Sequence, residues 1–530
     1  MRKIHLYCLT LVSGILLSFP WIVRGFGWTL FVAFVPLLFA DSFILQPKRA
    51  QGLFHSFLFS FLAFLTWNVL STWWIAYVSV PGMLFVTSLN ALLMAIVWWG
   101  KSKVQLKMGE ASGLFSLVIF WLAYEFLNHH GLLPWPWLTL GNGFANNVEI
   151  IQWYEYTGVW GGSLWVLIVN VIIFNAFKKN QEFLVLRFYK PIGNIIIVIL
   201  LPVILSLYLY FNYSENGLIQ KVVVVQPNID PYTEKFTGMS EKEQVDRLVA
   251  LTEGKITDST DLVLMPETAL PPVWEDSNQL NDSSLKSLEQ IINRFPHVSM
   301  VAGAISHIKL GDSEAKSATA LQSASGEYYF VRFNSAILLD TSHRVQFSHK
   351  NILVAGVEKA PLSEYFSFLP NVMLDLGGIK GGLSAGDEPI NLISKSGQKI
   401  GPVICFESVF GNHVRQLVEN GAQYIAVLTN DGWWKGASGI WQHFGYSRIR
   451  AIETRRGVVR SANTGISGII DQRGDIQVQT TKNIAVAISS ELHINNSSTF
   501  YVRNGDYIGL ISLLLAGLVG IYSFVLRKVL

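Results

Sequence analysis

Three side chains of different chemistry lie in or beside short apolar runs of the sequence. Glu267 follows "LVLMP", Lys350 lies within "FSHKNILV", and Cys405 follows "GPVI". A thiol with an ordinary pKa of about 8.5 needs a base or a cation nearby before it reacts as a thiolate. A carboxylate can accept the thiol proton, and an ammonium can stabilise the oxyanion of a tetrahedral intermediate. Together, the three groups would suit acyl transfer through a thioester.

Each of these residues also has an ordinary structural explanation when it is taken alone. Glu267 could cap the turn after its strand, Lys350 could be an exposed lysine, and Cys405 could be a small buried apolar residue. The chain has two cysteines, so a framework of several disulfides is excluded. No Cys and His spacing typical of a zinc site occurs, and we expect neither a metal nor another cofactor.

The composition indicates a membrane protein with one polar region. Of the 530 residues, 51% are hydrophobic and 15% are charged, whereas soluble domains have roughly 25% charged residues. The mean hydropathy is +0.36. Charged residues are sparse before residue 216, frequent over 216–505 and rare afterwards. The net charge of +3 is too small to indicate a nucleic-acid partner.

Apolar runs long enough to cross a hydrocarbon core of about 30 Å predict about eight membrane spans. They lie at about 4–23, 27–45, 53–79, 82–100, 112–128, 159–177, 192–212 and 507–526. The first run lacks a small-residue cleavage site and is followed at once by further spans, so we expect it to be retained. The predicted domains are 1–215, a bundle of about seven spans; 216–505, a polar domain; and 506–530, a last span.

Lysine and arginine residues follow every second span. They precede the first span, follow the second, fourth, sixth and eighth, and are nearly absent from the loops between. Because short cytoplasmic loops carry the excess of positive charge, both termini are predicted to face the cytoplasm. The domain at 216–505 then faces outward, which in a bacterium is the periplasmic side of the inner membrane.

The outward domain alternates short β-branched runs with helix-like stretches, which is typical of an α/β layered domain. The predicted strands are 221–226, 261–266, 298–305, 334–340, 399–407, 424–430, 457–463 and 467–474. The predicted helices are 240–254, 284–294, 410–419 and 441–455. Catalytic groups collect at strand ends in open α/β sheets, and Glu267 and Cys405 stand at such ends.

The order "LVLMPETALP", "HKNILVAGVE", "GPVICFES" resembles the Glu–Lys–Cys triad of the nitrilase, or carbon–nitrogen hydrolase, superfamily. The segment at 428–476, "LTNDGWWKGASGIWQHFGYSRIRAIETRRGVVRSANTGISGIIDQRGDI", resembles the one that closes this domain in apolipoprotein N-acyltransferases. Even "LLPWPWLTLGNGF", at 132–144, resembles a Pro–Trp loop of that family. The resemblance implies a nitrilase-like αββα domain inserted between the seventh and eighth helices of an all-α transmembrane bundle.

The resemblance also implies residue roles. Glu267 would be the general base, Lys350 would stabilise the oxyanion, and Cys405 would be the acylated nucleophile. Glu358 and Glu407 would support the active site. Two positions depart from the family pattern: Phe406 stands where tyrosine is usual, and "VAGVE" at 354–358 replaces "VPFGE". Neither departure touches the triad, and both bear on the donor pocket.

The function that the resemblance implies is a two-step acyl transfer. A membrane phospholipid would donate an acyl chain to Cys405, and the α-amino group of the N-terminal diacylglyceryl-cysteine of an apolipoprotein would accept it. Separately, we expect the enzyme to be a monomer. An alternative is a membrane-anchored nitrilase-type amidase that uses water as acceptor. A transporter or lipid channel is disfavoured because the spans are nearly free of ionisable residues, with Asp41 and Glu125 the main candidates.

Aromatic side chains near the three residues could contact lipid. Trp274 lies in "PPVWED", just after Glu267, and a second group lies in "LSEYFSFLPNVMLDLGG" at 362–378. The glycines of that second segment would let it move as a lid, but its apolar residues could equally pack into the domain's own core. The substrate or lid candidates are Trp274, Tyr365, Phe366, Phe368, Trp433 and Trp434.

Overall fold

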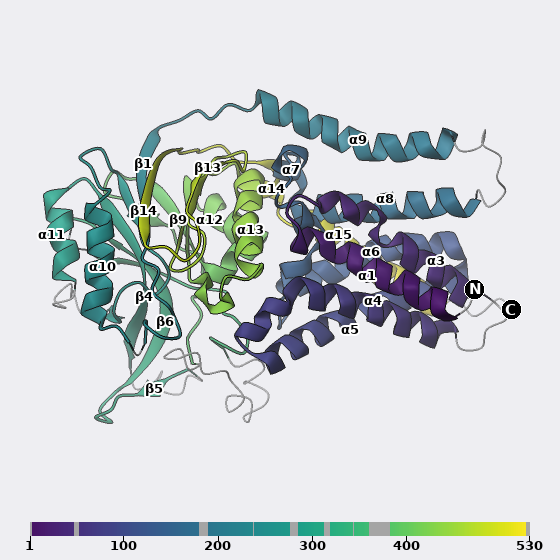
Figure 1. Ribbon diagram of the computed structural model, residues 1–530, viewed down its shortest axis with the longest axis horizontal. Coiled ribbons are helices and arrows are strands. Elements are labelled where there is room, and N and C mark those ends of the chain that lie inside the picture. Colours follow the sequence, from purple (N-terminus) through teal and green to yellow (C-terminus); the bar gives the residue numbers. More distant parts are fainter. Residues whose placement is uncertain are drawn as a thin grey trace. The chain divides into compact units, whose positions relative to one another are not determined.

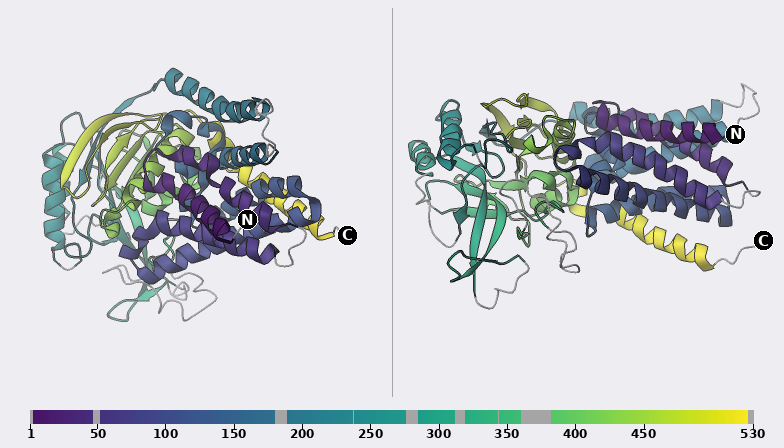
Figure 2. Two further views of the ribbon diagram at one scale, coloured as in Figure 1. Left: turned by 45° about the vertical axis from the view of Figure 1, so that its right-hand side comes forward. Right: turned by 60° about the horizontal axis from the view of Figure 1, so that its bottom comes forward.

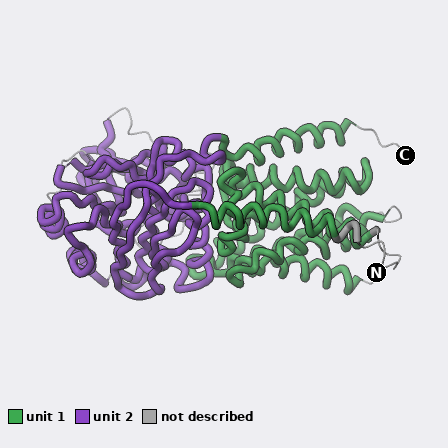
Figure 3. Tube along the Cα trace, turned by 90° about the horizontal axis from the view of Figure 1, so that it is seen from above, with its two compact units in different colours: residues 1–213, 504–530 green, residues 214–503 purple. Residues whose placement is uncertain are grey.

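The chain folds into two compact units, Met1–Tyr213 with Asn504–Leu530, and Ser214–Arg503 (Figure 3). The structure is a computed structural model. It describes residues 3–46, 52–179, 189–236, 238–275, 285–311, 319–342, 344–359 and 382–525. Tyr365, Phe366, Phe368 and the whole of the proposed lid segment at 362–378 lie outside these ranges, so their predicted role stays a prediction.

The first unit consists of helices, most of them long and apolar (Figures 1 and 2). They are α1 (Lys3–Ile22), α2 (Leu30–Ala33), α3 (Val35–Ile44), α4 (Gly52–Thr72), α5 (Val80–Met108), α6 (Glu110–His130), α7 (Tyr154–Thr157), α8 (Val159–Lys179), α9 (Tyr189–Asn212) and α15 (Tyr507–Val525). Within the described ranges, eight helical segments are long and apolar enough to cross a membrane, by length and composition. The predicted all-α bundle of about eight spans is confirmed.

A buried ion pair inside this unit corrects one detail of the predicted spans. The apolar runs predicted that the fourth span ends at residue 100, with Lys101 in the following loop. In the structure, α5 continues to Met108 and is followed by the cap residue Gly109, whose φ is +89°. Lys101 is 1% exposed, and its Nζ lies 2.5 Å from Asp41 Oδ2 on α3. The apolar-run reading failed because it ends a span at the first charge, even where an opposite charge compensates it.

The second unit contains two stacked β-sheets with helices on both outer faces (Figure 1). The first sheet has the order β14-β1-β2-β4-β6-β5, with β3 paired to β4 and β7 paired to β6. Its strands are β1 (Ile219–Gln226), β2 (Leu262–Leu264), β3 (Val273–Trp274), β4 (Ser299–Leu310), β5 (Leu321–Gln322), β6 (Tyr329–Leu339), β7 (Gln346–His349) and β14 (Val486–His493). Strands β1, β2 and β4 run parallel.

The second sheet has the order β13-β12-β11-β10-β9-β8, and β9, β10 and β11 run parallel. Its strands are β8 (Leu392–Ile393), β9 (Lys399–Ile404), β10 (Tyr424–Thr429), β11 (Val458–Ala462), β12 (Gly468–Ile470) and β13 (Ile476–Gln479). The outer helices are α10 (Glu241–Glu253), α11 (Lys286–Arg294), α12 (Gly411–Glu419) and α13 (Gly439–Thr454). A short helix, α14 (Phe500–Asn504), follows.

Strand β1 shows why these strands are apolar on both faces. Val222 and Val224 point into the core between the sheets, whereas Val223 and Val225 pack in the core that contains side chains of α10 and α11. Because successive side chains of a strand alternate between faces, a strand covered on both sides needs an unbroken apolar run. The αββα layering predicted for this domain is therefore confirmed.

Most predicted elements of the domain are present, and three strands are clearly shorter than expected. The strand predicted over 399–407 ends at Ile404, where a 3₁₀ turn (Cys405–Val409) begins. The strands predicted over 261–266 and 467–474 reduce to Leu262–Leu264 and Gly468–Ile470. The sequence analysis did not identify β14, which pairs with β1 along its whole length. Most residues of β14 are only half-buried, and polar residues follow Ile488, so the strand lacks a long continuous apolar run.

The buried pair of Asp41 and Lys101 yields a stability prediction. Lys101→Met leaves an uncompensated carboxylate inside the helical unit and should destabilise it by about 3 kcal/mol or more. The double variant Asp41→Leu, Lys101→Met removes both charges and should recover most of that loss. Thermal unfolding in detergent micelles measures both effects, with Lys103→Met, an exposed neighbour on α5, as the control. A single variant as stable as the unaltered protein would contradict the argument.

Candidate active site

The three candidate residues lie just beyond the ends of strands in the two facing sheets. Glu267 follows β2 and Lys350 directly follows β7, both in the first sheet, whereas Cys405 directly follows β9 in the second. The ends of β2 and β9 share one core, since Leu264 and Ile404 both belong to the cluster between the sheets. The sheet packing therefore brings residues that are far apart in sequence to one place.

A buried charge cluster forms around the Lys350 ammonium. Its Nζ donates to Glu358 Oε1 at 2.8 Å and lies 3.4 Å from Glu267 Oε1. Asn334, on β6, donates from Nδ2 to Glu267 Oε1 at 2.8 Å and to Glu358 Oε1 at 3.0 Å. All four side chains are buried. The amide of Asn334 thus holds the two carboxylates on one side of the ammonium.

Glu358 reaches this cluster from the "VAGVE" segment. The Val354 backbone N–H donates to Glu358 Oε2 at 2.8 Å, and Gly356, at the turn, has a φ of +84°. Glycine adopts this left-handed conformation without a steric penalty. The unusual "VAGVE" sequence therefore still delivers Glu358 to Lys350.

Burial and neighbouring charges set the protonation states of Lys350 and Cys405. Burial alone would lower the pKa of Lys350, but Glu358 and Glu267 outweigh it and raise that pKa above its ordinary value. Burial raises the pKa of the Cys405 thiol, and the nearby charge of Glu267 raises it further against the opposing effect of Lys350. The resting site therefore holds an ammonium and a protonated thiol.

Cys405 adopts a left-handed backbone conformation, with a φ of +53°. Such a conformation costs a non-glycine residue on the order of 1–3 kcal/mol and persists where surrounding contacts fix it. The Ser408 hydroxyl donates to the Cys405 carbonyl oxygen at 2.8 Å, and His443 Nε2 lies 3.1 Å from the same oxygen. These contacts hold the sharp turn that presents the sulfur.

A fully buried network supports this turn from behind. His443 Nδ1 lies 2.9 Å from Asp431 Oδ1, and Arg460 Nη2 lies 2.8 Å from Asp431 Oδ2. Burial would raise the pKa of Asp431, but Arg460 and His443 lower it to about 2, so it is ionised. The contacts among Ser408, His443 and Asp431 resemble those of a Ser–His–Asp catalytic triad. All three side chains are, however, fully buried. The network therefore positions the Cys405 turn, and the buried Ser408 hydroxyl is not accessible to a substrate.

Glu407 links the cysteine turn to the segment that carries Lys350. Its Oε2 accepts from the Ile404 N–H at 2.8 Å, and its Oε1 accepts from the N–H groups of Asn351 at 2.6 Å and Ile352 at 3.2 Å. Burial would raise the pKa of Glu407, but His413, the hydrogen bond from Ile404 and the charge of Lys350 lower it. The ionised carboxylate of Glu407 thus links backbone groups at or just beyond the ends of strands of the two different sheets.

The other predicted site residues lie in aromatic contacts. Phe406 is buried with its ring 5.0 Å from that of Phe410, so the apolar ring packs in the domain interior. Trp274 packs on His307 at the edge of the first sheet. Trp433 packs on Tyr232, and Trp434 packs on His443, which contacts the cysteine turn. None of these contacts involves the charge cluster itself.

The sequence analysis did not single out Asn334, His443 or Arg460. One signal for Asn334 was available, because it is a polar residue within the apolar strand "NSAILLD". His443 and Arg460 lie in a helix and a strand with no local feature that marks them. Within the described ranges, no group of three or more His, Cys, Asp or Glu side chains could hold a metal ion.

Comparisons with known proteins agree with this architecture. Residues 221–492 match the family described as carbon–nitrogen hydrolase, which is the class of domain that the two sheets and the cysteine turn form. Residues 13–172 match the apolipoprotein N-acyltransferase N-terminal domain. The chain belongs to the carbon–nitrogen hydrolase family and, with this helical region, to its apolipoprotein N-acyltransferase branch.

Two relatives with that name match this chain along nearly their whole length. The chain is 28% identical to the apolipoprotein N-acyltransferase of Chlorobaculum tepidum, over 98% of this chain and 97% of that protein. It is 27% identical to that of Geobacter metallireducens, over 94% and 92%. Among solved structures, a mutant of an amidase of the nitrilase superfamily from Nesterenkonia covers 55% of this chain and 94% of its own, at 14% identity and a TM-score of 0.36.

The charge cluster predicts that substitutions of Glu267 and Lys350 shift the pKa of the Cys405 thiol in opposite directions. Glu267→Gln removes a negative charge that raises the thiol pKa and should lower that pKa, whereas Lys350→Met removes a positive charge that lowers it and should raise it further. A pH titration of the rate at which iodoacetamide alkylates Cys405 measures both shifts, because that rate follows the thiolate fraction even well below the pKa. The titration is done in a Cys8→Ser background, since Cys8 is exposed.

Two controls make this titration specific. Cys405→Ser in the same background gives the blank, and Glu253→Gln, an exposed carboxyl on α10, should leave the thiol pKa unchanged. Shifts of the same sign for Glu267→Gln and Lys350→Met would contradict the cluster's electrostatics.

Proposed function

We propose that this chain transfers an acyl chain from a membrane phospholipid to the α-amino group of the N-terminal diacylglyceryl-cysteine of apolipoproteins. The observation that carries the proposal is the meeting of the Cys405 turn with the buried cluster of Lys350, Glu267 and Glu358. The names of the relatives, which match along nearly their whole length, support the same reaction.

In the first step, Glu267 accepts the Cys405 proton and the sulfur attacks the ester carbonyl of the phospholipid. The ammonium of Lys350 stabilises the oxyanion of the tetrahedral intermediate. The carbon–oxygen ester bond then breaks, and Glu267 returns the proton to the leaving alcohol. The products are a lysophospholipid and an acyl thioester on Cys405.

In the second step, the amine of the acceptor attacks the thioester carbonyl while Glu267 takes a proton from the nitrogen. Lys350 again stabilises the oxyanion, the carbon–sulfur bond breaks, and the proton passes back to the sulfur. An amide and the resting thiol result. The same three groups serve both halves, which is the pattern of a ping-pong reaction.

The helical unit would keep the enzyme at the membrane, where both of its substrates are located. An acyl chain gains about 0.8 kcal/mol of membrane affinity per buried CH₂, so drawing either substrate into water would be costly. Eight helical segments within the described ranges are apolar enough to keep the protein in the bilayer. The basic loops support a proposed orientation in the inner membrane with the catalytic domain facing the periplasm, and a single chain contains all the proposed groups.

The proposal predicts an acyl adduct on Cys405. Protein incubated with phospholipid vesicles and no acceptor should gain one fatty acyl mass on the peptide that contains Cys405, detected by mass spectrometry and released by hydroxylamine. Cys405→Ser should abolish lipoprotein N-acylation, and Cys8→Ser should leave it unchanged. Hydrolysis of small amides without any lipid-derived adduct would instead support the amidase with water as acceptor.

A further inference from the structure

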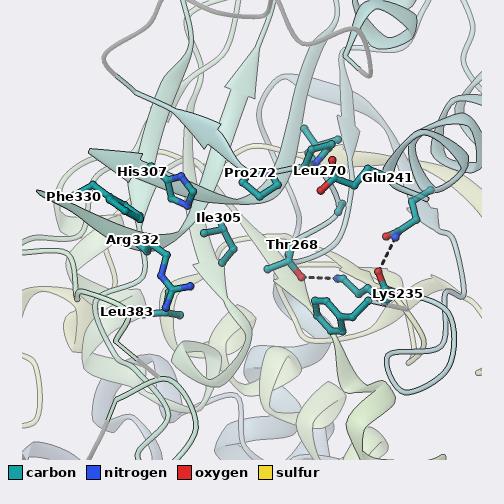
Figure 4. Close-up of a pocket in the computed structure, with 14 residues that line it drawn as sticks. Lys235, Glu241, Thr268, Leu270, Pro272, Ile305, His307, Phe330, Arg332 and Leu383 are labelled. Carbon is teal, nitrogen blue, oxygen red and sulfur yellow. Dashed lines mark hydrogen bonds between the residues drawn. The ribbon is translucent and has the colours of Figure 1, made fainter. Parts of the chain in front are cut away.

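A pocket of about 360 Å³ adjoins the backbone of Glu267 (Figure 4). Thr268, the next residue, forms part of its wall, and Lys235 lies beside it. The Lys235 ammonium donates to Thr268 Oγ1 at 2.5 Å and lies 3.4 Å from the Glu267 carbonyl oxygen. The pocket is therefore next to the proposed general base without containing its carboxylate.

Two cationic side chains line this pocket from different elements. Lys235 precedes α10, and Arg332 lies on β6; Figure 4 shows Lys235 beside Thr268 and Arg332 near Leu383. Burial lowers the pKa of Lys235 to about 8, although the charge of Glu267 acts against this, and burial also lowers the pKa of Arg332. Glu241 is the acidic residue of the lining. Two partly desolvated cations against one carboxylate favour an anionic ligand.

The remaining walls are mostly apolar. Leu270, Pro272, Ile305, Phe330 and Leu383 line the space between the polar groups. A free inorganic anion would leave such walls without a partner, whereas an anion joined to a hydrocarbon portion would contact both kinds of surface. The lining thus fits an amphiphilic phosphate ester.

We infer that this pocket holds the phosphate of the acyl donor, a phosphodiester of a glycerophospholipid, with Lys235 and Arg332 as its binding residues. The identity of the donor rests on the proposed function. Ammonium and guanidinium groups both bind phosphate oxygens through charge-assisted hydrogen bonds. In a glycerophospholipid, the glycerol separates the phosphate from the ester carbonyl. A phosphate held beside Thr268 therefore leaves the ester free to approach Glu267 and Cys405.

The test compares acyl donors with and without a phosphate. Lys235→Gln and Arg332→Gln should each raise the KM for a phosphatidyl donor about tenfold, with little change in kcat. The KM for diacylglycerol presented in the same detergent micelles should stay unchanged. Lys242→Gln, which removes an exposed cation from α10, is the matched control and should change neither value. An equal effect on both donors, or none on the phosphatidyl donor, would overturn the inference.

A binding measurement separates this inference from the proposed function. Glycerophosphate titrated into the full-length protein in a calorimeter should bind the unaltered protein and the Lys242→Gln variant, and should not bind the Lys235→Gln, Arg332→Gln double variant. Retained diacylglycerol turnover shows that the double variant is folded. Glycerophosphate binding by a protein that never acylates Cys405 would overturn the proposed function alone.

Two outcomes of the titration distinguish the source of the phosphate. Inorganic phosphate that binds as tightly as glycerophosphate would overturn the assignment to a lipid headgroup, because the glycerol part of the ligand would then contribute nothing to binding. Acylation of Cys405 without any glycerophosphate binding would overturn the pocket assignment and leave the acyl transfer standing.

Discussion

The buried ammonium of Lys350 is the interaction on which the polar interior of the second unit depends. A charge in such a place is stable only with opposite charges and hydrogen bonds around it. Glu358 and Glu267 supply the charge, and Asn334 fixes the two carboxylates relative to each other. These residues come from the ends of β2 and β7, from β6 and from the following loop. The first sheet therefore has to bring four segments together before the site has its electrostatic character.

Cys405 comes from the other sheet, so the site also depends on how the two sheets are aligned. Glu407 fixes this alignment, because its two oxygens accept backbone N–H groups on both sides: Ile404 before the cysteine turn, and Asn351 and Ile352 after Lys350. Behind the turn, Asp431 and His443 hold the strained backbone of Cys405. The domain thus fixes the position of Cys405 by buried contacts among its own residues.

Much of the fold and part of the site could be predicted from the sequence, for a local physical reason. Strands covered on both faces need continuous apolar runs, and such runs also mark where polar site residues begin, as at Glu267 and Cys405. What failed had a weak local signal or none: β14 is mostly half-buried, and Lys101 is a charge within a span. The one cue for Asn334 was its polarity in an apolar strand, and the carboxylate that it contacts lies 67 residues away in sequence. His443, Arg460 and the cationic pocket depend on tertiary packing in the same way.

The raised thiol pKa of Cys405 also has a consequence for the lifetime of the protein. Oxidants and foreign disulfides react with thiolates far faster than with thiols. A cysteine that stays protonated until a substrate is bound therefore escapes sulfenic acid formation and mixed disulfides, even in an oxidising compartment. The burial and the negative charge of Glu267 that hold the sulfur in its resting state would then protect a lone cysteine from chemical ageing between catalytic cycles.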